Sequence, residues 1–158
     1  MNLAPEGGVA DFITTGAWGK KAFEEAGKYM EANQAATSKD SNFSTIPDVS
    51  DWNLTEGAKF VHICSNETIG GVEFKDVPDT GDVPLVADMS SNYLSKPIDV
   101  EKYGIIYGGV QKNIGPAGMA IVIVREDLIG KTHPLCPTMF DYALMAKNDS
   151  MYNTPPCW

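Results

Sequence analysis

Positive charge is scarce in this sequence. Its 158 residues include 12 lysines and arginines against 21 aspartates and glutamates, which gives a formal net charge of −9, and Arg125 is the only arginine. The acidic residues are scattered along the chain rather than gathered in a tail. Because a nucleic-acid-binding protein needs a basic face to meet the phosphate backbone, we expect no nucleic-acid partner.

Cysteines and histidines are also few. The sequence has three cysteines, without a C-x-x-C pair, and two histidines: Cys64, Cys136, Cys157, His62 and His133. An odd and dispersed set of cysteines supports neither a disulfide framework nor a zinc site, so we expect no bound metal. His62 lies inside the apolar stretch 60–64, where we expect a core histidine bonded to a neighbour rather than a ligand.

Long hydrophobic runs are missing as well. Residues 1–8 contain neither a basic start nor an apolar signal-peptide core, and the longest apolar run is far shorter than a membrane span. With 43% hydrophobic and 21% charged residues, the composition is that of a globular domain. We therefore expect a single domain over residues 1–158 of a cytoplasmic protein, with no membrane partner.

The apolar residues that are present form several short runs. These runs predict strands at residues 9–14, 59–64, 84–87, 104–107 and 120–124. Apolar residues at helical spacing from Ala17 to Met30 predict an amphipathic helix, the polar segment 33–56 leaves room for one short strand at 35–38, and a weaker helical pattern covers 138–147. Continuous apolar strands with helical or loop connections indicate an α/β fold, with a mainly parallel sheet covered on both faces in three layers.

One lysine stands in a glycine-rich turn between the last two apolar runs. The stretch 107–116 reads YGGVQKNIGP and places Lys112 at the end of a sheet that we expect to be buried. Such a turn holds the backbone while leaving one amine free to react, so Lys112 is a candidate Schiff-base former. A nucleotide-binding P-loop does not fit, because that motif needs a glycine directly before its lysine and a hydroxyl after it, whereas Gln111 and Asn113 flank Lys112.

Two further residues could assist Lys112, although each has a simpler interpretation. Asp88 follows the apolar run 84–87, where a carboxylate needs a cation or a hydrogen-bond donor, and it could equally be a helix or turn cap. Trp18 lies in the first turn of the predicted helix, where periodicity alone favours a core residue. Reactive residues at the carboxyl ends of parallel strands lie where this architecture binds ligands, and Thr68 also fits that rule.

These residue types match the needs of pyridoxal phosphate. That cofactor requires a lysine for a Schiff base, a carboxylate that keeps the pyridine nitrogen protonated, and an apolar plate against the ring. Lys112, Asp88 and Trp18 could supply these groups in turn.

Five stretches of the sequence then resemble one family in order and spacing. They are TTGAW at 14–18, SNETI at 65–69, ADMSS at 87–91, GVQKNIGPAG at 109–118 and YNTPP at 152–156. Through these stretches the chain is similar to the phosphoserine aminotransferases, class V members of the fold-type-I pyridoxal phosphate enzymes. The resemblance implies part of the large domain of that fold. It also implies amino transfer between L-glutamate and 3-phosphohydroxypyruvate, giving O-phospho-L-serine and 2-oxoglutarate in serine biosynthesis.

The same resemblance implies roles for residues at matching positions. Lys112 would form the Schiff base and shuttle a proton between the substrate α-carbon and the cofactor. Asp88 would pair with the pyridinium nitrogen, and Trp18 would stack on the ring. Thr68 would bond the cofactor near its phenolic oxygen, and Gln111 would contact its phosphate.

The resemblance further implies a homodimer and a longer protein. Asn153 and Thr154 match residues that reach the cofactor phosphate of the neighbouring subunit. A segment before Met1, with a glycine-rich phosphate turn and a substrate-binding arginine, and a small C-terminal domain with further arginines would lie outside this sequence. The isolated chain is therefore expected to be a central fragment, inactive or nearly so. The alternative is a truncated product that binds the cofactor without turnover or acts as an interaction module.

Overall fold

A computed structural model describes residues 1–154, so Cys157 and the two prolines that end the last motif lie outside the described residues. Within residues 1–154, Cys64 and Cys136 are free thiols. No group of three or more histidine, cysteine, aspartate or glutamate side chains in this part of the chain is placed to hold a metal ion. None of its helices has the length and apolar character needed to cross a membrane.

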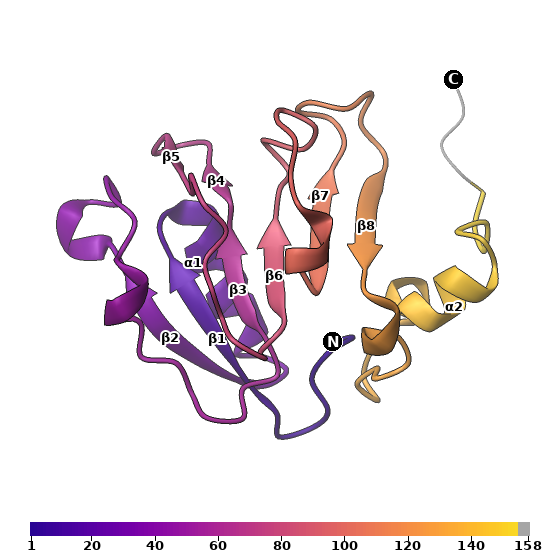
Figure 1. Ribbon diagram of the computed structural model, residues 1–158. Coiled ribbons are helices and arrows are strands. Elements are labelled where there is room, and N and C mark those ends of the chain that lie inside the picture. Colours follow the sequence, from indigo (N-terminus) through magenta and orange to yellow (C-terminus); the bar gives the residue numbers. More distant parts are fainter. Residues whose placement is uncertain (155–158) are drawn as a thin grey trace.

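A six-stranded sheet forms the centre of the fold (Figure 1). In the order β2-β1-β3-β6-β7-β8, its strands are β2 Glu31–Thr37, β1 Val9–Thr14, β3 Val61–Cys64, β6 Leu85–Asp88, β7 Ile105–Gly109 and β8 Ala120–Val124. Neighbouring strands pair in parallel except β7 and β8, which are antiparallel. The predicted α/β fold with a mainly parallel sheet is confirmed.

The remaining elements are short. They are α1 Ala17–Ala26, β4 Asn66–Glu67, β5 Val72–Glu73, α2 Tyr142–Lys147 and 3-10 helices at Lys39–Ser41, Val49–Asp51, Val100–Lys102, Glu126–Leu128 and Thr138–Phe140. The helix predicted up to Met30 ends at Ala26, followed by Gly27, because glycine is a poor helix former and commonly ends a helix. The strand expected at 35–38 is the end of the longer β2, whose sequence EANQAAT lacks an apolar run.

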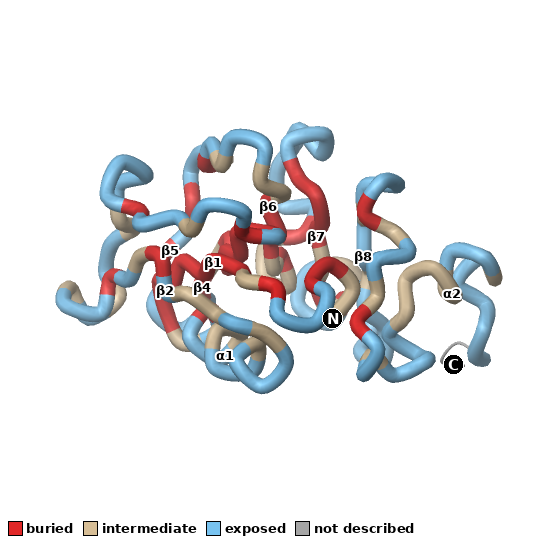
Figure 2. Tube along the Cα trace, turned by 90° about the horizontal axis from the view of Figure 1, so that it is seen from below, coloured by how far each residue is buried: buried red, intermediate tan, exposed pale blue. Residues whose placement is uncertain are grey.

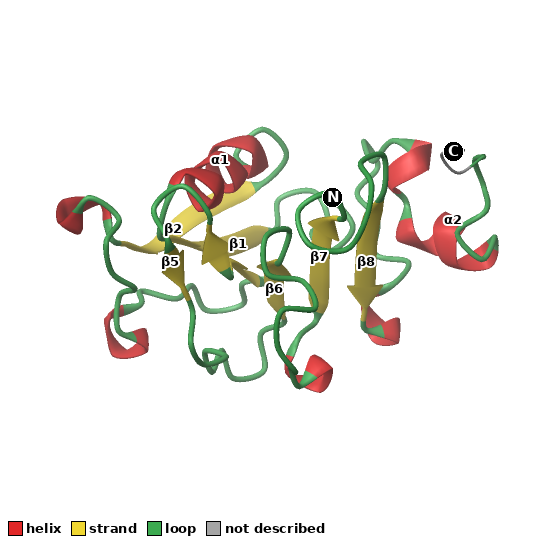
Figure 3. Cartoon of the chain, turned by 90° about the horizontal axis from the view of Figure 1, so that it is seen from above, coloured by secondary structure: helices red, strands yellow, loops and turns green. Residues whose placement is uncertain are grey.

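Two hydrophobic cores lie on opposite faces of the sheet. Along the strands, side chains alternate between the faces, so that Phe12 and Val86 belong to the core under α1 while Ile13 and Ile63 belong to the other. Figure 3 shows α1 on one face and loops with 3-10 helices across the other. The fold therefore has three layers, with loops rather than long helices as the third, and Figure 2 shows the burial concentrated in the central strands.

The strand after the lysine turn is not buried as predicted. Residues Ala120–Val124 are exposed or half-buried, with Val122 38% and Ile123 40% exposed. β8 forms the edge of the sheet in the described chain and pairs only with β7. The expected buried sheet on both sides of Lys112 is therefore confirmed for β7 and wrong for β8, because burial depends on what packs over a strand and not only on its apolar residues.

Candidate active site

The side chains singled out around Lys112 meet at the carboxyl end of the parallel strands. A cavity of about 220 Å³ is lined there by Trp18, Cys64, Asn66, Asp88, Ser90, Ser91, Gln111 and Lys112. These residues lie at or just after the ends of β1, β3, β6 and β7. Since parallel strands bring their carboxyl ends to one edge, residues far apart in sequence share one site there.

Lys112 is held loosely within this site. Its Nζ donates to Thr68 Oγ1 at 2.9 Å and lies 5.3 Å from the centroid of the Trp18 ring. None of the salt bridges in residues 1–154 involves Lys112. The amine therefore has a hydroxyl and an aromatic face as neighbours, and no carboxylate neutralises it directly.

Trp18 faces the site rather than the core. Its side chain is 38% exposed, so the interpretation of Trp18 as core that periodicity favours is wrong. The residues of α1 that pack on the sheet are Ala22, Phe23 and Ala26, one to two turns further along. Trp18 is in the first turn of α1, at the end of the sheet, where its ring projects past the core toward Lys112.

Asp88 uses one of its two carboxylate oxygens within the chain. Oδ1 accepts from the backbone N of Ser90 at 2.8 Å and from Ser90 Oγ at 2.6 Å. Among residues 1–154, no hydrogen bond to Oδ2 is found. The interpretation of Asp88 as a turn cap is therefore confirmed. Its role beside Lys112 stays a prediction, which its place in the lining of the cavity allows. Ser90 was not predicted, and its signal is the D-x-S spacing of a turn in which aspartate bonds the backbone two residues on.

The titratable side chains buried near Asp88 are uncharged at neutral pH. His62 Nε2 and the Tyr107 hydroxyl are 2.8 Å apart, which confirms the prediction of a core histidine bonded to a neighbour. Burial lowers the pKa of His62 to about 4, against the opposing effect of the Asp88 charge. Burial, with the Asp88 charge, raises the pKa of Tyr107. Burial likewise raises the pKa of the Cys64 thiol, so that thiol is not a nucleophile at neutral pH.

The predicted phosphate contacts are divided between two places. Gln111 lines the cavity, and its side chain lies so close to Gly109 that a Cβ there would be 2.5 Å from Gln111 Oε1. Asn153 and Thr154 are exposed, follow α2 and do not line the cavity. Figure 1 shows their segment beyond β8, away from the site. Their roles stay predictions.

Arg125 lies at the opposite end of the sheet from Lys112, because β8 runs antiparallel to β7. Its Nε donates to Asp127 Oδ1 at 2.6 Å and its Nη2 to Asp127 Oδ2 at 3.1 Å. It directly precedes the 3-10 helix Glu126–Leu128 and is partly exposed at the surface.

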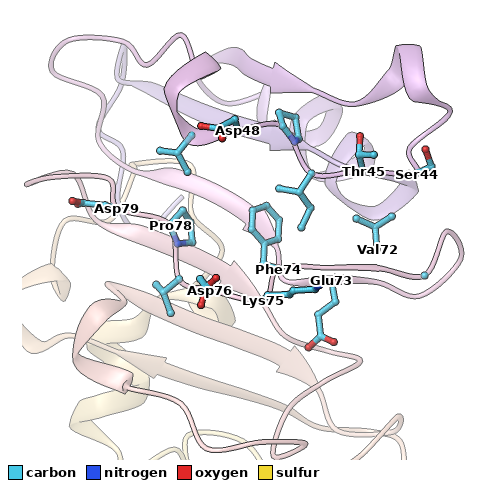
Figure 4. A pocket seen from close by; sticks show the side chains of 15 residues that line it. Ser44, Thr45, Asp48, Val72, Glu73, Phe74, Lys75, Asp76, Pro78 and Asp79 are labelled. Carbon is cyan, nitrogen blue, oxygen red and sulfur yellow. The ribbon is translucent and has the colours of Figure 1, made fainter.

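A larger cavity, of about 710 Å³, lies elsewhere, between residues 44–49 and 71–79 (Figure 4). Three of its acidic side chains have local partners: Asp48 accepts from Ser50, Glu73 accepts from Asn92 and pairs with Lys96, and Asp79 accepts from Gly81 N. None of the residues predicted for chemistry lines it. Cavity size alone therefore does not identify the active site of this chain.

Comparisons with known proteins agree on one family. The model of the aminotransferase class-V family matches residues 3–158. The phosphoserine aminotransferase of Ectopseudomonas mendocina is 58% identical over 155 residues, which are 98% of this chain and 43% of the relative.

Two solved structures give the same result. The phosphoserine aminotransferase from Bacillus circulans subsp. alkalophilus superposes with a TM-score of 0.91 at 47% identity, covering 96% of this chain and 42% of that one. A phosphoserine aminotransferase from Trichomonas vaginalis with bound PLP has a TM-score of 0.89 at 41% identity, covering 98% of this chain and 44% of that one. The chain spans less than half the length of the relatives it matches. Because the family match runs through nearly all of the sequence, the chain belongs to the aminotransferase class-V family.

Proposed function

We propose that this chain is the central, cofactor-binding part of a phosphoserine aminotransferase. The reaction is the pyridoxal phosphate-dependent transfer of the amino group of L-glutamate to 3-phosphohydroxypyruvate, which gives 2-oxoglutarate and O-phospho-L-serine. The observation that carries the proposal is the Lys112 amine, held by Thr68 beside the Trp18 ring at a cavity that Asp88 also lines. The named relatives supply the choice of substrates.

The residues present fit pyridoxal phosphate. The cavity offers a lysine amine, an aromatic face and a carboxylate with one free oxygen in the described chain. When bound, the cofactor supplies an electron sink that stabilises negative charge at the substrate α-carbon. Asp88 supports that role, because its charge favours a protonated ring nitrogen.

Each of the other residues then has a defined task. Lys112 Nζ would hold the cofactor and, when free and neutral, would accept and return the proton of the substrate α-carbon. Trp18 would pack against the ring and limit the orientations that the cofactor can adopt. Thr68 Oγ1, which accepts from Lys112 Nζ, orients the amine. Gln111 contributes a polar contact to the phosphate.

The complete site requires groups that the cavity does not contain. We assign Asn153 and Thr154 to the phosphate of the partner subunit's cofactor in a cytoplasmic homodimer, a role that their exposed positions permit. Both substrates carry carboxylates and one carries a phosphate, which arginine binds best. The only arginine of the chain, Arg125, is paired with Asp127 at the other end of the sheet.

The test uses the complete gene product that contains this chain, reconstituted with pyridoxal phosphate. We expect a visible absorption band from the lysine-bound cofactor and amino transfer from glutamate. Lys112→Ala removes the band. Lys20→Ala changes an exposed lysine on α1, paired with Glu24, and leaves the band unchanged. A band that persists in the Lys112 variant would contradict the proposal.

A second candidate is a truncated product that binds the cofactor without turnover or serves as an interaction module. The isolation of Arg125 from the cavity favours it for the 158-residue chain alone. We expect the isolated chain, mixed with cofactor, glutamate and the keto acid, to give little or no 2-oxoglutarate. Robust turnover by the isolated chain would show that no further arginine is needed.

A further inference from the structure

Glu67 is a fully buried acidic residue next to the candidate active site. Its exposure is 0%, and none of the salt bridges found in residues 1–154 involves it. Its carboxylate instead accepts two backbone hydrogen bonds, from Trp18 N to Oε2 at 2.9 Å and from Gly19 N to Oε1 at 2.7 Å. The two oxygens thus bind consecutive amides in the first turn of α1.

The first turn of α1 has no cap of its own. Gly16 occupies the position before the helix and offers no side chain, and the first amides of any helix lack partners within that helix. Glu67, 48 positions after Gly19 in sequence, fills that role from another part of the fold. A negative charge there is also favoured by the helix dipole.

The fit between Glu67 and α1 depends on two glycines. A Cβ on Gly16 would lie 2.5 Å from Glu67 Cδ, and a Cβ on Gly19 would lie 3.1 Å from Oε1. The main chain of Glu67 is fixed as well, because its carbonyl accepts from Gly71 N at 2.7 Å and β4 pairs with β5. The carboxylate is therefore held from both sides.

Glu67 connects both groups that contact Lys112. Trp18, whose amide Glu67 binds, presents its ring 5.3 Å from Lys112 Nζ. Thr68, the next residue in the chain, accepts a hydrogen bond from the same Nζ. A shift of Glu67 would move the ring and the hydroxyl relative to the amine.

We propose that Glu67 is a positioning residue that fixes Trp18 and Thr68 around Lys112. The inference rests on the proposed function for its effect on the cofactor, although the Glu67 contact with α1 stands without it. A second consequence is that the amides of Trp18 and Gly19 are occupied by a carboxylate. These two amides are thus unavailable to the phosphate of the cofactor.

The experiment compares Glu67→Gln with Asp11→Asn in the complete gene product. Both variants replace a fully buried carboxylate by an amide of the same shape, but Asp11 contacts Asn33 and Thr55 away from the cavity. In the cofactor-free protein, hydrogen exchange of the Trp18 and Gly19 amides is measured. In the reconstituted protein, circular dichroism of the visible band reports how the cofactor is oriented.

For Glu67→Gln we expect the Trp18 and Gly19 amides to exchange at least about tenfold faster, since a hydrogen bond to a charged acceptor is lost. We also expect the visible circular dichroism to change. Asp11→Asn leaves both readouts as in the wild type and affects stability only. If Glu67→Gln does not fold, Gly16→Ala, whose Cβ displaces the carboxylate without removing it, is expected to give the same two changes.

Two results would overturn the proposal. One is unchanged exchange of both amides in Glu67→Gln; the other is a change in circular dichroism that Asp11→Asn reproduces to the same extent. A wild-type protein without any visible band would instead reject the proposed function. In that case the amide exchange still decides whether Glu67 holds the first turn of α1.

Discussion

Two aspartates on strands of the same sheet differ in how completely their carboxylates are bonded. Asp11 of β1 is fully buried and uses both oxygens: Oδ1 accepts from Asn33 Nδ2 and Thr55 Oγ1, each at 2.8 Å, and Oδ2 accepts from Thr55 N at 2.8 Å. Asp88 of β6 is half-buried, and only its Oδ1 is bonded, to Ser90.

The difference follows from the position of each residue in its strand. Asp11 is the third residue of β1, where neighbouring segments cover it and a buried charge without partners would be very unfavourable. Asp88 is the last residue of β6, where the sheet ends and the cavity begins. Within the core, Asp11 uses both carboxylate oxygens inside the chain, whereas Asp88 at the carboxyl end of the sheet leaves hydrogen-bonding capacity for a ligand.

The largest expected effect on activity comes from replacing an aspartate by asparagine, and it should differ between Asp88 and Asp11. Asp88→Asn removes the charge that favours a protonated ring nitrogen, and we expect amino transfer by the complete protein to fall by at least about 10²-fold, with the fold intact. Asp11→Asn places an amide nitrogen against donors, and we expect it to lower the free energy of unfolding by about 2 kcal/mol with activity unchanged. Steady-state kinetics measure the activity of both variants, and urea unfolding measures their stability. A similar loss of activity in both variants would contradict the proposed difference between the two aspartates.

The next effect concerns His62, a buried histidine of β3 whose Nε2 contacts the Tyr107 hydroxyl and whose Nδ1 has no hydrogen-bond partner among the described residues. Burial lowers its pKa from an ordinary 6.5 to about 4, so between these pH values the unfolded chain binds a proton that the folded chain does not. This contribution to the free energy of unfolding is complete above pH 6.5 and is lost as pH falls toward 4, by about 3 kcal/mol in total.

His62→Gln removes this titration while keeping a polar group for Tyr107. We expect the variant to lose less stability than the wild type between neutral pH and about pH 4.5, measured by urea unfolding at both. Identical pH profiles would show that His62 is not the proton-binding group.

The smallest expected effect is a difference in stability between alanine variants of two glycines near Lys112. A Cβ on Gly108 would lie 2.8 Å from the backbone of Ser90 and 2.9 Å from Tyr93, whereas nothing lies within 4 Å of one on Gly115. We expect Gly108→Ala to lower the free energy of unfolding by about 2 kcal/mol through overpacking, and to weaken cofactor binding by shifting the Asp88–Ser90 turn.

Gly115→Ala is the matched control and is expected to stay within about 0.5 kcal/mol of the wild type. Urea unfolding and cofactor titration check both variants. Equal losses of stability at the two positions would mean that the turn around Lys112 is tightly packed throughout. That result would contradict the difference between crowded Gly108 and open Gly115.

Much of the fold could be predicted, because its signals are local. The apolar runs predict β1, β3, β6 and β7 to within two residues at their starts, and the glycine-rich turn identifies Lys112. The helical spacing predicts α1, but not that Trp18, in its first turn, is 38% exposed. β2 was only partly predicted, because its sequence EANQAAT is mostly polar and contains no large apolar residue.

The sequence by itself determined most strands of the main sheet, the α/β class and the lysine with its flanking turn, since apolar runs and turn residues act over a few positions. Tertiary structure alone decided that β8 is exposed at the edge of the sheet. It also decided that the carboxylate of Glu67 binds an amide 49 positions earlier. The physical reason is the parallel sheet, which brings the ends of distant strands to one edge, where contacts depend on neighbours in space and not on neighbours in the chain.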